Sequence, residues 1–205
     1  MKPINFVVLS FLCVSLLGLA GCASYQARPL KSLINQSSSE SKEQSVSFVS
    51  HTFTKSDCKR YLDRDVIAKG YQPIQLTITN NSNRHLRLAM DSFSMPIVFP
   101  EEVAEKVHTS TIKRATSYGI GALFIPILVI PAVVDGVGSS QANQKLDIDF
   151  DQKSMRDTVI NPHSTINGLI FTPVEGFNPA FSFSVFDTKT NERFVFSTTS
   201  TQLKI

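Results

Sequence analysis

The chain has 205 residues, and its 20 lysines and arginines against 17 aspartates and glutamates give a net charge of +3. This near balance, with no run of basic residues, argues against nucleic acid as a partner. Tryptophan is absent and phenylalanine is abundant, with 15 residues, a composition that suits the core of a β-sandwich better than a carbohydrate-stacking cleft.

The N-terminal segment has the layout of a secretory signal peptide. A charged start at Lys2 precedes an apolar stretch over residues 4–19, and the stretch closes in Leu19-Ala20-Gly21-Cys22. Small residues just before the cut are typical of such signals. The four closing residues resemble the lipobox of bacterial lipoproteins. The resemblance implies a signal peptide over residues 1–21, cleavage between Gly21 and Cys22, and acylation of Cys22.

The same resemblance implies where the protein resides. A lipoprotein carries several acyl chains, palmitate among them, and more than one chain is needed for stable membrane attachment. Ala23 and Ser24 follow the cysteine, where lipoproteins kept at the inner membrane tend to have aspartate. We therefore expect the periplasmic face of the outer membrane in a two-membrane organism. An ordinary signal peptide or an uncleaved membrane helix are the alternatives.

The mature chain divides by composition into a tether and one domain. Residues 22–45 are polar and rich in serine, which predicts a lipidated N-terminus and flexible tether. Residues 46–205 are predicted to form a single domain. Its only cysteine, Cys58, has no partner within the mature chain once Cys22 is acylated, and we expect it to be a small buried apolar residue.

The first elements of the domain are predicted to be a strand and a helix. Residues 46–54 alternate like a strand. Residues 57–69 have helical spacing, with Asp57 as the expected N-cap and Gly70 where a left-handed cap is needed.

Strand signals dominate on both sides of the middle of the chain. Residues 71–83 alternate between a dry and a wet face and end in an asparagine-rich turn, and Leu86 and Leu88 continue the pattern. A further short strand is expected around Phe93 and Met95. Later segments with the same alternation or with turn residues cover 160–164, 169–171, 181–186, 187–192 and 194–196. Such spacing predicts a mainly β fold, an antiparallel sandwich. It resembles immunoglobulin-like domains in general plan, without their paired cysteines and core tryptophan.

An insertion at about 100–156 interrupts the strands. Residues 100–117 read as helical, residues 118–134 are uncharged and apolar, and residues 136–140 read as a flexible exit. From Gln141 onward, helical spacing competes with strand alternation over 146–151. The apolar run would reach only about 25 Å as a helix. Pro126 and Pro131 would interrupt it. A membrane-spanning helix, a buried hairpin or helical arm, and a membrane-dipping or partner-covered loop all remain open.

Residues with catalytic or metal-binding potential do not form a recognisable site. Asp147, Asp149 and Asp151 alternate as in an EF-hand loop, but the required glycine and final glutamate positions hold Gln152 and Thr158. The four histidines are scattered, and no nucleophile elbow or phosphate loop is present. We therefore expect no metal, no cofactor and no enzymatic activity.

Two functions are compatible with the sequence. The first is a membrane-anchored envelope lipoprotein that acts as a binding or structural module for another envelope protein. The alternative is a membrane-active or assembly subunit whose apolar segment 118–134 inserts into lipid or a partner protomer. The residues expected to make that contact are the large apolar ones of this segment: Ile120, Leu123, Phe124, Ile127, Leu128 and Ile130.

Overall fold

A computed structural model describes residues 24–33, 46–109 and 129–198, with the backbone alone for 129–139. The chain divides into two compact units. The sheet unit comprises Gln26–Val107 and Asp147–Ile205, and the insert unit comprises Met1–Tyr25 and His108–Leu146. Each unit is considered by itself below.

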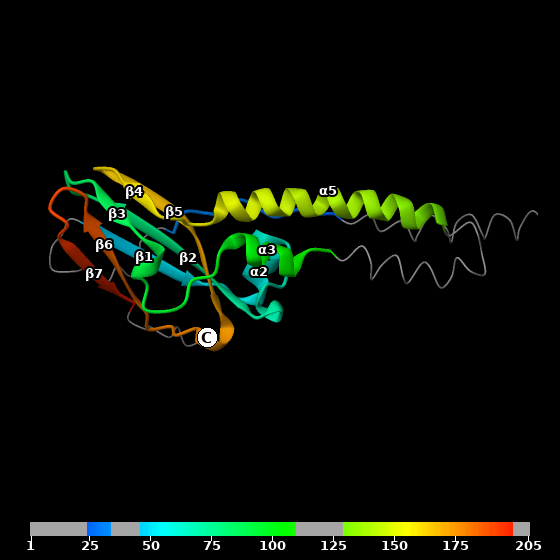
Figure 1. The fold of residues 1–205 in the computed structure, drawn as a ribbon, viewed down its shortest axis with the longest axis horizontal. Coiled ribbons are helices and arrows are strands. Elements are labelled where there is room, and N and C mark those ends of the chain that lie inside the picture. The colour runs from blue at the N-terminus through cyan, green and yellow to red at the C-terminus, as the bar shows by residue number, and fades with distance from the viewer. Residues whose placement is uncertain (1–23, 34–45, 110–128, 199–205) are drawn as a thin grey trace, which may run out of the picture. The chain divides into compact units, whose positions relative to one another are not determined.

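Two antiparallel sheets form the sheet unit (Figure 1). The first sheet has the order β1-β2-β5 and the second has the order β4-β3-β6-β7. The strands are β1 (Val46–Thr52), β2 (Tyr71–Asn80), β3 (Leu86–Leu88), β4 (Thr158–Ile160), β5 (Ser164–Pro173), β6 (Ser182–Asp187) and β7 (Arg193–Ser197). Each sheet combines strands that precede residue 100 with strands that follow residue 156, so neither group of strands forms a sheet alone.

The core lies between the two sheets, and its residues come from alternate strand positions. β2 contributes Ile74, Leu76 and Ile78, which are fully buried. Phenylalanines join the two layers: the ring of Phe48 on β1 lies 5.1 Å from that of Phe183 on β6 and 5.6 Å from that of Phe196 on β7, centroid to centroid. Edge-to-face packing of this kind is favourable beyond the burial of area. The antiparallel sandwich predicted from the alternation is confirmed at this level.

The helical content is higher than the mainly β prediction allows, so the fold is mixed α and β. Helix α2 (Lys55–Leu62) follows β1, and its N-cap is Thr54, which corrects the expected cap at Asp57. Asp57 is instead the third helical residue and completes a capping box with Thr54. The helix ends at Leu62, and a 3₁₀ turn η1 (Ile67–Lys69) leads to Gly70, whose φ of 93° confirms the left-handed cap.

Two expected elements between β3 and residue 109 are absent or shorter. Phe93 and Met95 do not form a strand; they follow the 3₁₀ turn η2 (Met90–Ser92) and bury their side chains in the core. The helix predicted over 100–117 is α3 (Pro100–Val107), and residues 108–109 have already left it. Residues 110–117 lie outside the described part of the chain.

Helix α5 (Val129–Lys153) replaces the predicted flexible exit and resolves the conflict over 146–151. Residues 136–140 are helical, because Gly136 and Gly138 are tolerated inside a long helix at a modest cost. Within the insert unit, the side-chain oxygen of Asn143 accepts a hydrogen bond from the Thr109 amide at 2.9 Å. In the described ranges, we find no helix with the length and apolar character needed to cross a bilayer.

Candidate functional site

The outer face of the first sheet is covered by the chain itself. Residues 26–33 have no regular secondary structure, yet they bond to β2: the Gln75 side chain donates to the carbonyl oxygen of Lys31 at 2.6 Å, and the Leu33 amide donates to the Thr77 hydroxyl at 3.4 Å. Gln75 and Thr77 are consequently buried, with 3% and 5% exposure. The solvent-exposed face predicted for β2 is therefore wrong, because residues 26–33, far away in sequence, cover it.

The C-terminal end of helix α5 packs on the first sheet at its β5 edge. The rings of Phe150 on α5 and Phe171 on β5 stack at 5.8 Å. The ammonium of Lys153, only 8% exposed, donates to the carbonyl of Tyr61 at 2.7 Å and to Asp149 at 2.5 Å. These contacts fasten the end of α5 to β5 and to α2.

The outer face of the second sheet is covered only in part: Ser184 on β6 is fully buried, whereas its neighbours in the other strands are exposed. The strand register aligns Val159, Arg87, Phe186 and Arg193 in one row across β4, β3, β6 and β7. Val159 and Val195 keep 47% and 56% of their surface exposed, and both arginines are exposed. We call these five residues, Arg87, Val159, Phe186, Arg193 and Val195, the open face.

The open face is cationic and apolar together. The Arg87 guanidinium lies over the Phe186 ring at 5.2 Å from its centroid, and Arg193 Nε donates to the Ser184 hydroxyl at 2.8 Å. Neither arginine forms an ion pair with the described residues, and no acidic residue occupies an outward position of these four strands. Two guanidinium groups between exposed valines can hold carboxylates while the apolar surface is buried.

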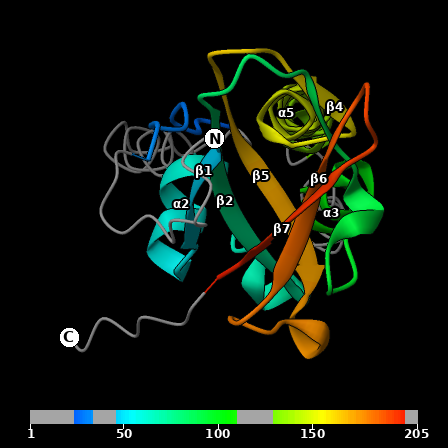
Figure 2. The ribbon, with the colours of Figure 1, turned by 90° about the vertical axis from the view of Figure 1, so that its left-hand side faces the viewer.

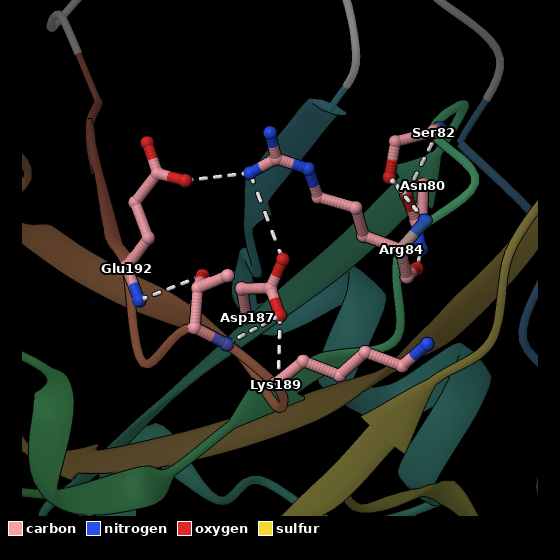
Figure 3. Close-up of polar contacts among 7 residues, drawn as sticks. Asn80, Ser82, Arg84, Asp187, Lys189 and Glu192 are labelled. Atoms are coloured by element: carbon pink, nitrogen blue, oxygen red, sulfur yellow. Dashed lines mark hydrogen bonds and ion pairs between the residues drawn. The ribbon is translucent and has the colours of Figure 1, made fainter.

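A second polar cluster lies where the β2–β3 and β6–β7 connections meet (Figure 3). The Arg84 guanidinium points between two carboxylates, at 2.6 Å from Glu192 and 3.6 Å from Asp187. The fully buried Asn80 amide donates to the carbonyls of Arg84, Ile160 and Asn161, and its oxygen accepts from Ser82.

The groups of this cluster are used to fix the loops. The Asp187 carboxylate accepts the amides of Lys189 and Thr190, and these bonds, assisted by Arg84, lower the pKa of Asp187. Because its carboxylates and amides satisfy one another, the cluster has little left to offer a ligand. It holds the turn that leads into β7, and thereby positions the open face.

The residues predicted to carry the function lie mostly outside the described chain. Gly21 and Cys22 do so, as do Ile120, Leu123, Phe124, Ile127 and Leu128. Ile130 is part of α5, where only its backbone is described. The lipidation and contact hypotheses therefore stay predictions.

The residues with possible thiol reactivity or metal binding, Cys58 and the three alternating aspartates, lie in the sheet unit. Cys58 is fully buried, as predicted, and burial raises the pKa of its thiol to about 11. The three alternating aspartates are helical; Asp149 pairs with Lys153, and Asp151 pairs with Arg156. Among the residues that the structure describes, no group of histidine, cysteine and carboxylate side chains could hold a metal ion.

The open face was not recognised from the sequence. The only available signal was alternation, because Arg87 lies between the core residues Leu86 and Leu88 and must face away from them. Alternation does not reveal register, so it could not show that Arg87, Phe186 and Arg193 become neighbours. The chain matches no protein-family model, no curated protein and no solved structure.

Proposed function

We propose that this chain is an envelope lipoprotein, anchored through acylated Cys22, whose sheet unit binds another envelope protein through the open face. The lipobox supports the anchor and, with Ala23 and Ser24 after it, the periplasmic face of the outer membrane. The partner presents carboxylates flanked by apolar side chains, because those groups complement Arg87, Arg193 and the two exposed valines.

The observation that carries this proposal is the difference between the two sheets. The first sheet is closed by residues 26–33 and by α5, whereas the second leaves a row of apolar and cationic side chains in water. The exposed valines lie beside the stacked Arg87 and Phe186, and contact of these apolar surfaces with water is unfavourable. Such a face is typical of a surface that a partner covers.

The strand order supports an immunoglobulin-like plan for the binding module. In chain order, the first, second and fifth strands form one sheet, and the third, sixth and seventh lie in the other. This is the division seen in constant-type immunoglobulin domains, except that the fourth strand pairs with the third instead of the fifth. Domains of this plan serve widely as binding modules, which is an argument by analogy.

The test is site-specific photo-crosslinking in cells that produce the full chain. A photoreactive residue at Val195 should capture a defined partner, and one at Gln152, an exposed position on α5, should not. The pair Arg87→Glu and Arg193→Glu should abolish the Val195 product, because it places like charges against the carboxylates of the partner.

Lys189→Glu is the matched control, an exposed cation in the β6–β7 loop whose reversal should leave the product intact. Equal capture at Val195 and Gln152, or capture that survives the double reversal, would contradict a binding role for the open face. Capture of lipid at Val195 would favour a membrane-active subunit instead.

A further inference from the structure

Residues 26–33, part of the stretch predicted to be a flexible tether, are fixed to one flank of the sheet unit. The amide of Gln26 donates to the Asp63 carboxylate at 3.0 Å, and the amide of Arg28 donates to the carbonyl of Arg60 at 3.0 Å. Both acceptors lie at the C-terminal end of α2. Residue 26 is therefore held beside this helix before the chain runs on along β2.

The position of Gln26 limits where an anchor at Cys22 can lie. A stretch of four residues spans at most about 14 Å when fully extended. An acylated Cys22 therefore brings the C-terminal end of α2 to the lipid surface. We propose that this flank of the sheet unit is the membrane-facing surface and that its cations contact the headgroups of anionic lipids. The inference rests on the lipid anchor of the proposed function.

The charges on this flank fit an anionic surface. Four exposed cations, Arg28, Lys55, Lys59 and Arg60, are placed together by α2 and by the Arg28–Arg60 backbone bond; we call them the basic flank. None of the four forms an ion pair with the described residues. Basic residues close to an anchored end are attracted to anionic leaflets.

The acidic residues near the basic flank are already engaged. The carboxylate of Asp57 closes the capping box and contacts His51, that of Asp63 pairs with Arg64, and that of Asp65 accepts the Ala68 amide. These bonds do not cancel the charges, but with Arg64 the surface still carries five cations against these three carboxylates.

Other acidic residues of the sheet unit lie on α3 and at the end of α5. Helix α3 lies across the sheets from α2 (Figure 2). Its Glu101 contacts Arg156, which also binds Asp151 of α5, and its Glu102 accepts from the Tyr71 hydroxyl. Glu101 and Asp151 are paired with Arg156, so these carboxylates are partly neutralised, and α3 lies apart from the basic flank on α2.

This orientation also leaves the distal end free. β2 has ten residues and begins next to η1 and α2. It therefore carries the Asn80 end of the sheets about 30 Å from that flank. The loop cluster around Arg84 and Asp187 lies at this distal end, where it stays in water.

Short-range fluorescence quenching tests the orientation. The full mature lipoprotein carries a thiol-reactive fluorophore at Ser56→Cys on α2 or at Thr188→Cys in the β6–β7 loop. It is reconstituted into vesicles of phosphatidylcholine and phosphatidylglycerol that also contain a lipid with a quenching nitroxide on its headgroup. Cys58 stays unlabelled, because it is fully buried and its thiol pKa is raised to about 11. We expect quenching at position 56 and none at position 188.

Charge dependence separates headgroup contact from simple tethering. Lys55→Glu with Lys59→Glu should abolish the quenching at position 56, whereas Lys189→Glu should leave it unchanged. Raised salt should weaken it in the unaltered chain, which guards against a folding defect in the variant. Vesicles without phosphatidylglycerol should show the same loss.

The failure of each part can be recognised. Protein that floats with the vesicles but shows equal quenching at both positions, or stronger quenching at position 188, overturns the orientation and leaves the anchor intact. Quenching at position 56 that is indifferent to charge reversal and to salt overturns the role of the basic flank. Protein that floats with no vesicle overturns the lipid anchor and this inference with it.

Discussion

Lys153 shows how a single residue can connect distant parts of the sheet unit. Its ammonium is nearly buried and has two acceptors, the carbonyl of Tyr61 on α2 and the carboxylate of its helical neighbour Asp149. A lysine is seldom buried unless it is paired in this way. The residue therefore fixes the end of α5 against α2.

We predict that Lys153→Met lowers the free energy of unfolding by about 2 kcal/mol, since hydrogen bonds to a charged group are lost while the volume is kept. Urea unfolding of the two proteins, followed by circular dichroism, measures the difference. Gln152→Met, at an exposed neighbouring position, should change little. Equal unfolding free energies of Lys153→Met and the unaltered chain would show that the bonds of the buried ammonium do not stabilise the protein.

Helix α2 is stabilised at its first turn by a capping box, in addition to its buried side chains Cys58 and Leu62. The helix has eight residues, too few to be stable alone, and its N-terminus is closed by reciprocal bonds between Thr54 and Asp57. Burial raises the pKa of Asp57, but the bonds from Thr54 and the nearby His51 outweigh it, and the net pKa is lowered. The capping box should therefore stabilise the protein most when Asp57 is ionised.

Thr54→Ala should cost about 1 kcal/mol of unfolding free energy at neutral pH. Because the folded-state pKa of Asp57 is depressed, this contribution is present above its usual pKa of 3.8 and is lost as the pH falls through the folded-state value. The gap between Thr54→Ala and the unaltered chain should therefore narrow below pH 4. Ser56→Ala, in the same turn, is the control. A gap that is absent at pH 7 or does not change with pH would contradict the role of the box.

The elements that sequence predicts well are those whose signal is local. The strands over residues 46–52, 71–80, 182–187 and 193–197 follow from alternation and turn residues, and the left-handed position at Gly70 follows from the need for a residue without Cβ. Of β5, only residues 169–171 were predicted, because its first residue was assigned to the turn over 160–164. Thr54 was missed as N-cap because Asp57 is an equally good capping residue three positions later. The length of α5 was missed because glycines at 136 and 138 usually mark loops.

What could not be predicted depends on contacts between distant segments. Gln75 and Thr77 alternate with core residues as a solvated face would, and only the docking of residues 26–33 buries them. The open face has the same origin, since its row exists only in the register that joins β4, β3, β6 and β7. Local pattern reveals which way a side chain points but not what meets it.

In our proposal, the sheet unit has three surfaces with different roles. Its first sheet is closed by the segment that leads from the anchor, the basic flank faces lipid in our proposal, and the open face looks away from the covered sheet. A lipid-anchored binding module needs this division, because a surface pressed against the membrane is not available to a partner. The proposed role of the basic flank depends on the chain being acylated at Cys22.

Incorporation of a labelled fatty acid is the most direct measurement of that central claim. Cells that produce the full chain should label it, Cys22→Ala should abolish the label and leave an uncleaved precursor or a product cut elsewhere, and Cys58→Ala should label normally. The matched cysteine variant excludes acylation at the buried thiol. A Cys22→Ala protein that still takes up fatty acid and fractionates with membranes like the unaltered chain would contradict the lipoprotein assignment.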